Sequence, residues 1–162
     1  MRKWEERSLE TKYLLNPAFC SRMLYATILE YESKSGRPLP FPLIYLILPL
    51  VLHKRTREKI SSSTKLLNWT QTNQELLIGF PARAKEFVEI TNESIEFLLC
   101  SGMVQINDTG EIIRTPDIRK LNETEYLNEE IKQCVRKSQH VARWFIGAGT
   151  TENIYACLGV RP

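Results

Sequence analysis

The sequence predicts a mainly α-helical fold with one small β-hairpin, an α+β class with a winged-helix-like centre framed by N- and C-terminal helices. Three observations predict it. Apolar residues recur at helical spacing over most of the chain. Capping residues, prolines and glycines divide these stretches into short helices. Two short apolar runs, 103–106 and 111–114, flank an Asn-Asp-Thr-Gly turn, as in a hairpin. Helix, short helix and hairpin is the order found in winged-helix domains.

The length and composition are those of one globular domain. The chain has 162 residues, of which 43% are hydrophobic and 25% are charged, so it is neither disordered nor of low complexity. We expect a polar arm over residues 1–15 and a single helical, winged-helix-like domain over residues 16–162. Residues 1–60 carry 11 Lys and Arg against 6 Asp and Glu, but the net charge of the chain is only +3. That excess is too small to indicate nucleic-acid binding by itself.

Residues 16–36 predict the first helix of the domain. Asn16 is a favoured N-cap, Pro17 suits the first turn, and apolar residues follow at helical spacing until Gly36. The prolines of residues 37–40 predict a rigid connector after it.

A second helix is predicted from Pro42 onward. It is apolar nearly all round, which indicates burial at the centre of the fold, and Pro49 is expected to bend or break it. The basic run His53–Lys59 is expected to form its C-terminal end, where cations offset the helix dipole. The apolar run 41–52 is shorter than the roughly 20 residues that span a bilayer, so no membrane segment is expected.

Shorter helices follow along the chain. One is predicted around residues 65–69. Thr72 and Glu75 form a capping-box pattern, so another helix is expected to begin there, with either a kink at its proline or a division at Gly79. Thr91 is expected to cap a further short helix that leads into the hairpin.

The hairpin is followed by a long amphipathic helix. Asn122 and Glu125 form a capping box at its expected start. The Gly-Ala-Gly sequence 147–149 is expected to end it, and Thr150 or Thr151 to cap a last short helix.

The cysteine spacing argues against a metal site. The four cysteines are separated by 80, 34 and 23 residues and form no CxxC pair, so a structural zinc site is not expected. Each lies in an apolar neighbourhood, which predicts buried free thiols and a reducing cytoplasm. The N-terminal residues alternate in charge and are not typical of a signal peptide. The cysteines are Cys20, Cys100, Cys134 and Cys157.

No catalytic, cofactor-binding or metal-binding constellation is predicted. The sequence has no P-loop, GxGxxG, GxSxG or HExxH pattern. Gly-Ala-Gly-Thr-Thr at 147–151 would place backbone amides at a helix N-terminus, where an anion binds, but a tight turn between helices is the favoured interpretation. His53 with Glu58 would suit a base and its orienting group, but no nucleophile lies at a matching spacing. We therefore expect a protein that is not an enzyme.

The basic run is the best candidate for function. Its Arg55, Arg57 and Lys59 suit contacts with phosphates or with an acidic protein surface. A solvated helix end is the alternative of equal weight. Trp4 lies on the polar arm, where it is hard to bury within one domain, and it is a candidate anchor for a partner.

Charge argues against DNA binding by the winged-helix-like centre. The helix before the hairpin of such a domain usually enters the major groove, but here it carries Glu93 and Glu96 and no Lys or Arg. Phosphates repel carboxylates. The hairpin tip, with Asp108 and Glu111, is acidic as well. This element is therefore predicted to serve packing or protein docking.

Several stretches of the chain are similar to one protein family. They are Leu15–Cys20, Leu39–Phe41, Pro49–Glu58, Ile78–Ala84, Arg143–Thr150 and Ile154–Pro162. Together they resemble the middle component of three-component ABC-ATPase systems, the small subunit of Lamassu-type antiphage and anti-plasmid defence complexes. The resemblance runs from about Leu15 to Pro162.

The resemblance implies a non-catalytic adaptor subunit of a bacterial defence complex. Such a subunit would bridge an SMC/Rad50-like ABC ATPase and an effector, often a nuclease, and would help restrain the effector until the ATPase senses foreign DNA. Contact with DNA is expected mainly through the complex, and no contact with a membrane is expected. The alternative is a winged-helix DNA-binding transcriptional regulator.

Charge and aromatic content select the candidate partner-binding residues. Arg161 also has an internal candidate partner, Glu58. The candidates are Trp4, His53, Lys54, Arg55, Arg57, Lys59, Arg143, Trp144 and Arg161.

Overall fold

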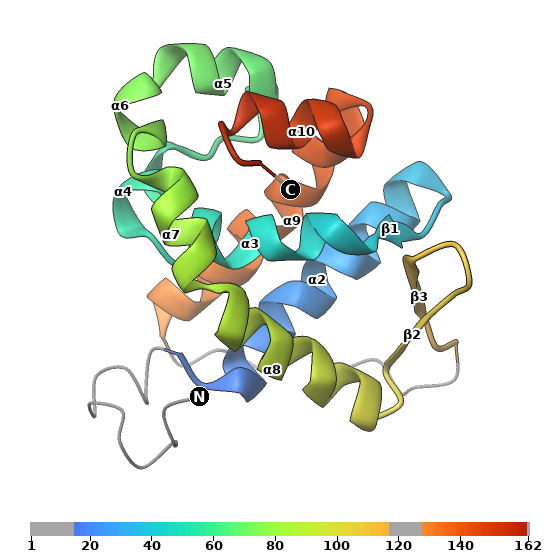
Figure 1. Ribbon diagram of the computed structural model, residues 1–162. Coiled ribbons are helices and arrows are strands. Elements are labelled where there is room, and N and C mark those ends of the chain that lie inside the picture. Colours follow the sequence, from blue (N-terminus) through green and yellow to red (C-terminus); the bar gives the residue numbers. More distant parts are fainter. Residues whose placement is uncertain (1–14, 117–127, 162) are drawn as a thin grey trace.

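The computed structural model describes residues 15–116 and 128–161, and the described chain is mainly helical with a small antiparallel sheet, as predicted (Figure 1). The helical elements are α2 (Pro17–Ser35), η2 (Phe41–Leu43), α3 (Ile44–Val51), α4 (Lys54–Lys59), α5 (Leu66–Thr72), α6 (Gln74–Leu77), α7 (Phe80–Glu86), α8 (Val88–Cys100), α9 (Glu129–Ala148) and α10 (Thr151–Cys157). The strands are β1 (Leu39–Pro40), β2 (Val104–Ile106) and β3 (Glu111–Arg114).

Helix α2 organises the core because it packs against both α8 and α9. Its predicted ends are confirmed. Asn16 Oδ1 accepts the backbone N–H of Ala18 at 2.8 Å, and Gly36 ends the helix with φ 68°, a left-handed conformation that glycine adopts without a Cβ clash. Apolar side chains are buried along most of its length, as expected for a helix enclosed by two others.

Helix α3 is the central buried helix, as predicted, and lies in the middle of Figure 1. Pro42 lies in the short 3-10 turn η2 that leads into it. Pro49 lies inside α3, which continues through it to Val51, so the predicted break at this proline is wrong, and a bend there stays a prediction.

The predicted position of the basic run, at the end of the apolar helix, is wrong. The run forms a separate helix, α4. His53 has an extended backbone, φ −78° and ψ 108°, and its Nδ1 accepts the N–H of Thr56 at 3.3 Å. A histidine N-cap therefore begins a new helix two residues after α3 ends, and the cations lie along α4.

Two predicted helix starts are also wrong. Thr72 is the last residue of α5, and its hydroxyl donates to the carbonyl of Asn68 at 2.8 Å. Thr91 lies inside α8, where its hydroxyl donates to the carbonyl of Phe87 at 2.7 Å. Both threonines satisfy their hydroxyls within a helix, which is the alternative to capping that this residue type has. The predicted division at Gly79 is confirmed, because α6 and α7 lie on either side of it.

The predicted hairpin is confirmed, and a third strand joins it. The strand order is β1-β3-β2, all antiparallel, and Leu39 of β1 pairs with Ile112 of β3. Both side chains are fully buried. Strand β1 was not predicted because it is two residues long and contains Pro40, which only an edge strand tolerates. The winged-helix interpretation of this region stays a prediction.

The C-terminal helices begin at polar caps. Asn128 Oδ1 accepts the N–H of Glu130 at 2.8 Å at the start of α9. Thr150 Oγ1 accepts the N–H of Asn153 at 3.3 Å, which confirms the cap of α10. The predicted capping box at Asn122 and Glu125 lies outside the described residues. So do Trp4 and the rest of the predicted arm except its last residue.

The four cysteines are free thiols, but the prediction that all are buried is wrong for Cys100, which is exposed, and for Cys157, which is only half-buried. Cys100 ends α8 on its exposed side. Cys20 and Cys134 are buried, and burial raises the pKa of the Cys20 thiol to about 12. Within the described ranges, no three His, Cys, Asp or Glu side chains are placed to hold a metal ion. The same part of the chain contains no helix with the length and apolar character needed to cross a membrane.

Candidate functional site

The structure separates the predicted partner-binding residues into internal and exposed groups. Arg57 and Trp144 lie inside the fold, each 4% exposed. Lys54, Arg55 and Lys59 are exposed on α4. The remaining candidates, His53, Arg143 and Arg161, lie at the surface on other elements, and Trp4 is outside the described residues.

Arg57 holds three helices together. Its NH1 group donates to the carbonyl of Val51 at 3.0 Å, and its NH2 group to Glu130 Oε1 at 2.6 Å. The guanidinium of α4 therefore caps the C-terminal end of α3 and pairs with the first turn of α9. Charged hydrogen bonds of this kind are stronger than neutral ones. In this conformation the Arg57 side chain is not available to a partner.

A second polar cluster links α4 to α7. Arg83 Nε donates to the carbonyl of Pro49 at 3.0 Å, and its NH2 group to Thr56 Oγ1 at 3.3 Å. Thr56 Oγ1 lies 2.7 Å from Nδ1 of His53. Arg83 is a structural residue that the sequence analysis did not single out, although it lies in the family-like stretch Ile78–Ala84. The guanidinium of Arg83 also lies over the ring of Phe80, 5.2 Å from the ring centroid. An aromatic residue three positions before an arginine on a helix is the sequence pattern that could have indicated this contact.

His53 is held as a neutral acceptor in this cluster. Its Nδ1 accepts from the backbone of Thr56, so that nitrogen carries no proton in the bonded state. Burial and then the nearby guanidinium of Arg83 hold the pKa of His53 below its ordinary value of 6.5. His53 is a helix cap. The hydroxyl beside its Nδ1, Thr56 Oγ1, is fully buried and also accepts a hydrogen bond from Arg83, so it is enclosed within the fold.

Trp144 is a core residue on α9. Its Nε1 donates to the carbonyl of Thr64 at 2.5 Å, and its ring lies 5.1 Å from that of Trp69. The next candidate, Arg143, points outward and pairs with Glu30 of α2 at 2.7 Å. These two adjacent residues therefore attach α9 to different neighbours. Among the described residues no ion pair joins Glu58 to Arg161, the internal pair considered above.

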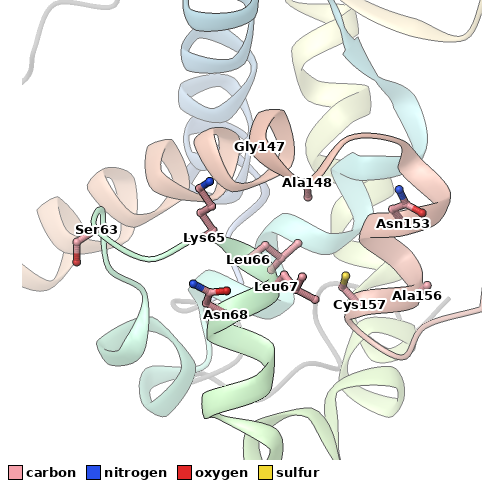
Figure 2. Close-up of a pocket in the computed structure, with 10 residues that line it drawn as sticks. All are labelled: Ser63, Lys65, Leu66, Leu67, Asn68, Gly147, Ala148, Asn153, Ala156 and Cys157. Carbon is pink, nitrogen blue, oxygen red and sulfur yellow. The ribbon is translucent and has the colours of Figure 1, made fainter.

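One groove lies where α5, α10 and the end of α9 meet, and we call it the α5/α10 groove (Figure 2). Its volume is about 700 Å³. Figure 2 shows Leu66 and Leu67 of α5 facing Cys157 of α10 across its middle, with Lys65 and Asn68 nearby. Leu67 is 55% exposed. The predicted Gly-Ala-Gly turn forms part of its wall, and the Thr150 hydroxyl there caps α10.

A second groove is lined by α3, α7, the start of α8 and the C-terminal end of the chain from α10 onward, and we call it the α3/α7/α10 groove. Its volume is about 630 Å³. The lining is mostly apolar, and among the described residues that form it Lys85 and Arg161 alone are charged. Of the predicted partner-binding residues that the structure describes, Arg161 alone lines a groove.

A comparison with protein families gives one finding. The family model described as ABC-three component (ABC-3C) system Middle Component 3 matches residues 4–162. No curated protein and no solved structure matches the chain. The match spans both grooves and every candidate residue named above.

Proposed function

The chain belongs to the Middle Component 3 family of ABC-three component systems, and we propose that it is a non-catalytic adaptor in the cytoplasm. In this role it bridges an SMC/Rad50-like ABC ATPase and an effector subunit, often a nuclease, in a Lamassu-type defence complex. It helps restrain the effector until the ATPase senses foreign DNA.

The observation that supports the adaptor role is that side chains in the family-like stretches form hydrogen bonds within the fold. Arg57, Arg83 and Trp144 all hydrogen-bond to backbone carbonyls of other elements. Active-site groups are instead held with open hydrogen-bonding capacity toward a substrate position. Side chains that fix helix positions suit a rigid body that presents surfaces to other subunits.

A DNA-binding regulator is the second candidate function, and the exposed cations of α4 favour it. Lys54, Arg55 and Lys59 are available to phosphates. Against it, the exposed side of α8, the helix before the hairpin, carries Glu89 and Glu96. If the protein is such a regulator, its binding to duplex DNA would weaken steeply as the salt concentration rises and would be lost in the Arg55→Ala variant.

Co-expression with the products of the flanking genes, followed by size-exclusion chromatography, tests the adaptor role. We expect elution as one complex with a long coiled-coil ATPase. Elution of this chain by itself, with folded neighbours present, would contradict the proposal. Duplex binding by the isolated chain in the same experiment series would then favour the regulator.

A further inference from the structure

We propose that the α3/α7/α10 groove is the docking site for a partner segment that combines apolar side chains with carboxylates. The inference rests on the proposed adaptor function and names the surface through which one partner subunit is held. Figure 1 shows the elements that enclose the groove, with α3 at the centre of the molecule.

The floor of the groove is apolar because the hydroxyls of its two tyrosines bond elsewhere. The hydroxyl of Tyr45 donates to Asn92 Oδ1 at 2.7 Å, and that of Tyr155 donates to the carbonyl of Pro42 at 2.6 Å. The two tyrosines therefore contribute their rings to the lining. Ala84 and Val88 complete the wall on the α7 and α8 side, and Val88 is 38% exposed. An apolar wall that remains exposed gains free energy when a partner covers it.

The charges of the groove are of one sign. Lys85 and Arg161 line it and are both exposed. No Asp or Glu of the described ranges lines the groove, and within those ranges no ion pair involves Lys85 or Arg161. Two unpaired cations beside an apolar floor are complementary to a segment whose apolar side chains are flanked by carboxylates. Apolar centres with charged rims, and arginine above all, are typical of protein interfaces.

The groove suits a protein segment better than a small ligand. Small-ligand sites carry polar groups that converge inside the cavity, whereas the tyrosine hydroxyls here are bonded within the fold and the cations are exposed. The α5/α10 groove lacks this charge pattern, because Lys65 is the single charged residue in the part of its lining that the structure describes. The described structure therefore favours the α3/α7/α10 groove as the docking site.

The test uses the full chain co-expressed with the two other components of the system. The variants are Val88→Glu, which places a carboxylate in the apolar wall, and Lys85→Glu with Arg161→Glu, which reverses the groove charge. Lys34→Glu with Arg136→Glu is the matched control, because it makes the same two charge changes on exposed residues of α2 and α9 outside both grooves. Val88 is the first residue of α8, where a carboxylate is compatible with the helix dipole, so folding should be unaffected.

We expect both groove variants to weaken binding of one component by about tenfold or more, and Lys34→Glu with Arg136→Glu to leave it unchanged. Rising salt should weaken the wild-type complex and should act less on the charge-reversed variant. A photo-crosslinker at position 88 should attach to an acidic segment of that component.

Each contrary result has one meaning. If wild type forms no complex, the adaptor function fails. If wild type assembles and the folded groove variants assemble equally well, the groove inference is overturned while the adaptor function stands. Crosslinks to a segment without carboxylates would overturn the stated chemistry of the partner. Circular dichroism and melting curves of each variant show that it is folded.

Discussion

Arg57 shows how one buried side chain fixes the position of three helices. Arg57→Ala removes charged hydrogen bonds to the carbonyl of Val51 and to Glu130. Glu130 is 63% exposed and is resolvated by water, so the loss arises mainly at the buried end of α3. We expect the free energy of unfolding to fall by about 2 kcal/mol, measured by chemical denaturation. Lys54→Ala on the same helix should change it by less than about 0.5 kcal/mol, and an equal loss for both would contradict this role.

His53 makes the stability of the protein dependent on pH. Its pKa in the folded state lies below 6.5, because of burial and the guanidinium of Arg83. The unfolded chain therefore binds the proton more readily, and protonation favours unfolding. Neutral His53 makes its full contribution to the free energy of unfolding above pH 6.5. This contribution is lost as the pH falls through the lowered pKa of His53 in the folded state. His140, whose pKa is lowered by burial and then by Arg143, acts in the same direction.

Melting temperatures between about pH 5 and 8 measure this effect. His53→Asn keeps a favoured N-cap without a titrating group, so its melting temperature should fall less toward acid than that of wild type. The lowered pKa values of Glu111 and Glu152 lie below 4.5 and so outside this range. An unchanged pH profile in His53→Asn would show that the histidine does not titrate against folding.

At the same scale, helix caps were predictable from the sequence, whereas the long-range ion pair of the buried Arg57 with Glu130 was not. Asn16 and Thr150 act on residues two and three positions away, so a local pattern predicts them. Arg57 and Glu130 are 73 residues apart. Nothing in the basic run distinguishes the one arginine that turns inward, because that depends on where α9 lies. The burial of Trp144 followed from its size and was the default expectation.

At the scale of elements, α3 is a central packing element, because it contacts η2 and the helices α2, α4, α7, α8 and α9. Leu46 is 1% exposed within it. Leu46→Asp would place an unpaired carboxylate in the core, and we expect a loss of about 4 kcal/mol or failure to fold. Leu46→Met keeps the apolar volume and should cost less than about 1.5 kcal/mol. A Leu46→Asp protein that melts like wild type would show that α3 is not enclosed in solution.

Element boundaries were predicted well where one residue type decides them. Gly36 ends α2 in a left-handed conformation that favours glycine, and Gly79 lies between α6 and α7, so both boundaries coincide with a residue type that is visible in the sequence. The threonines of α5 and α8 were misassigned because threonine bonds equally well to the preceding turn of a helix. Strand β1 exists only because β3 lies beside it, and its pairing joins residues 39 and 112. Such pairing is set by the fold and has no local signal.

At the scale of the whole molecule, the position of α2 predicts that the chain unfolds as one unit. This helix comes first in the described chain, yet it packs against α8 from the middle and α9 from the C-terminal part. Neither part can leave without exposing the apolar residues of α2 to water. We therefore expect a single cooperative transition, in keeping with the single domain predicted over residues 16–162.

Two probes check this cooperativity. Far-UV circular dichroism follows all helices. Tryptophan fluorescence of a Trp4→Phe variant follows Trp69 and Trp144, whose rings pack together between α5 and α9. Coincident denaturation curves would show that the helices and this contact are lost together. If the fluorescence changed first, α5 and its neighbours would form a separate, weaker unit. An adaptor built that way could release one partner by local unfolding, whereas a single cooperative unit must hold both grooves in a fixed relation.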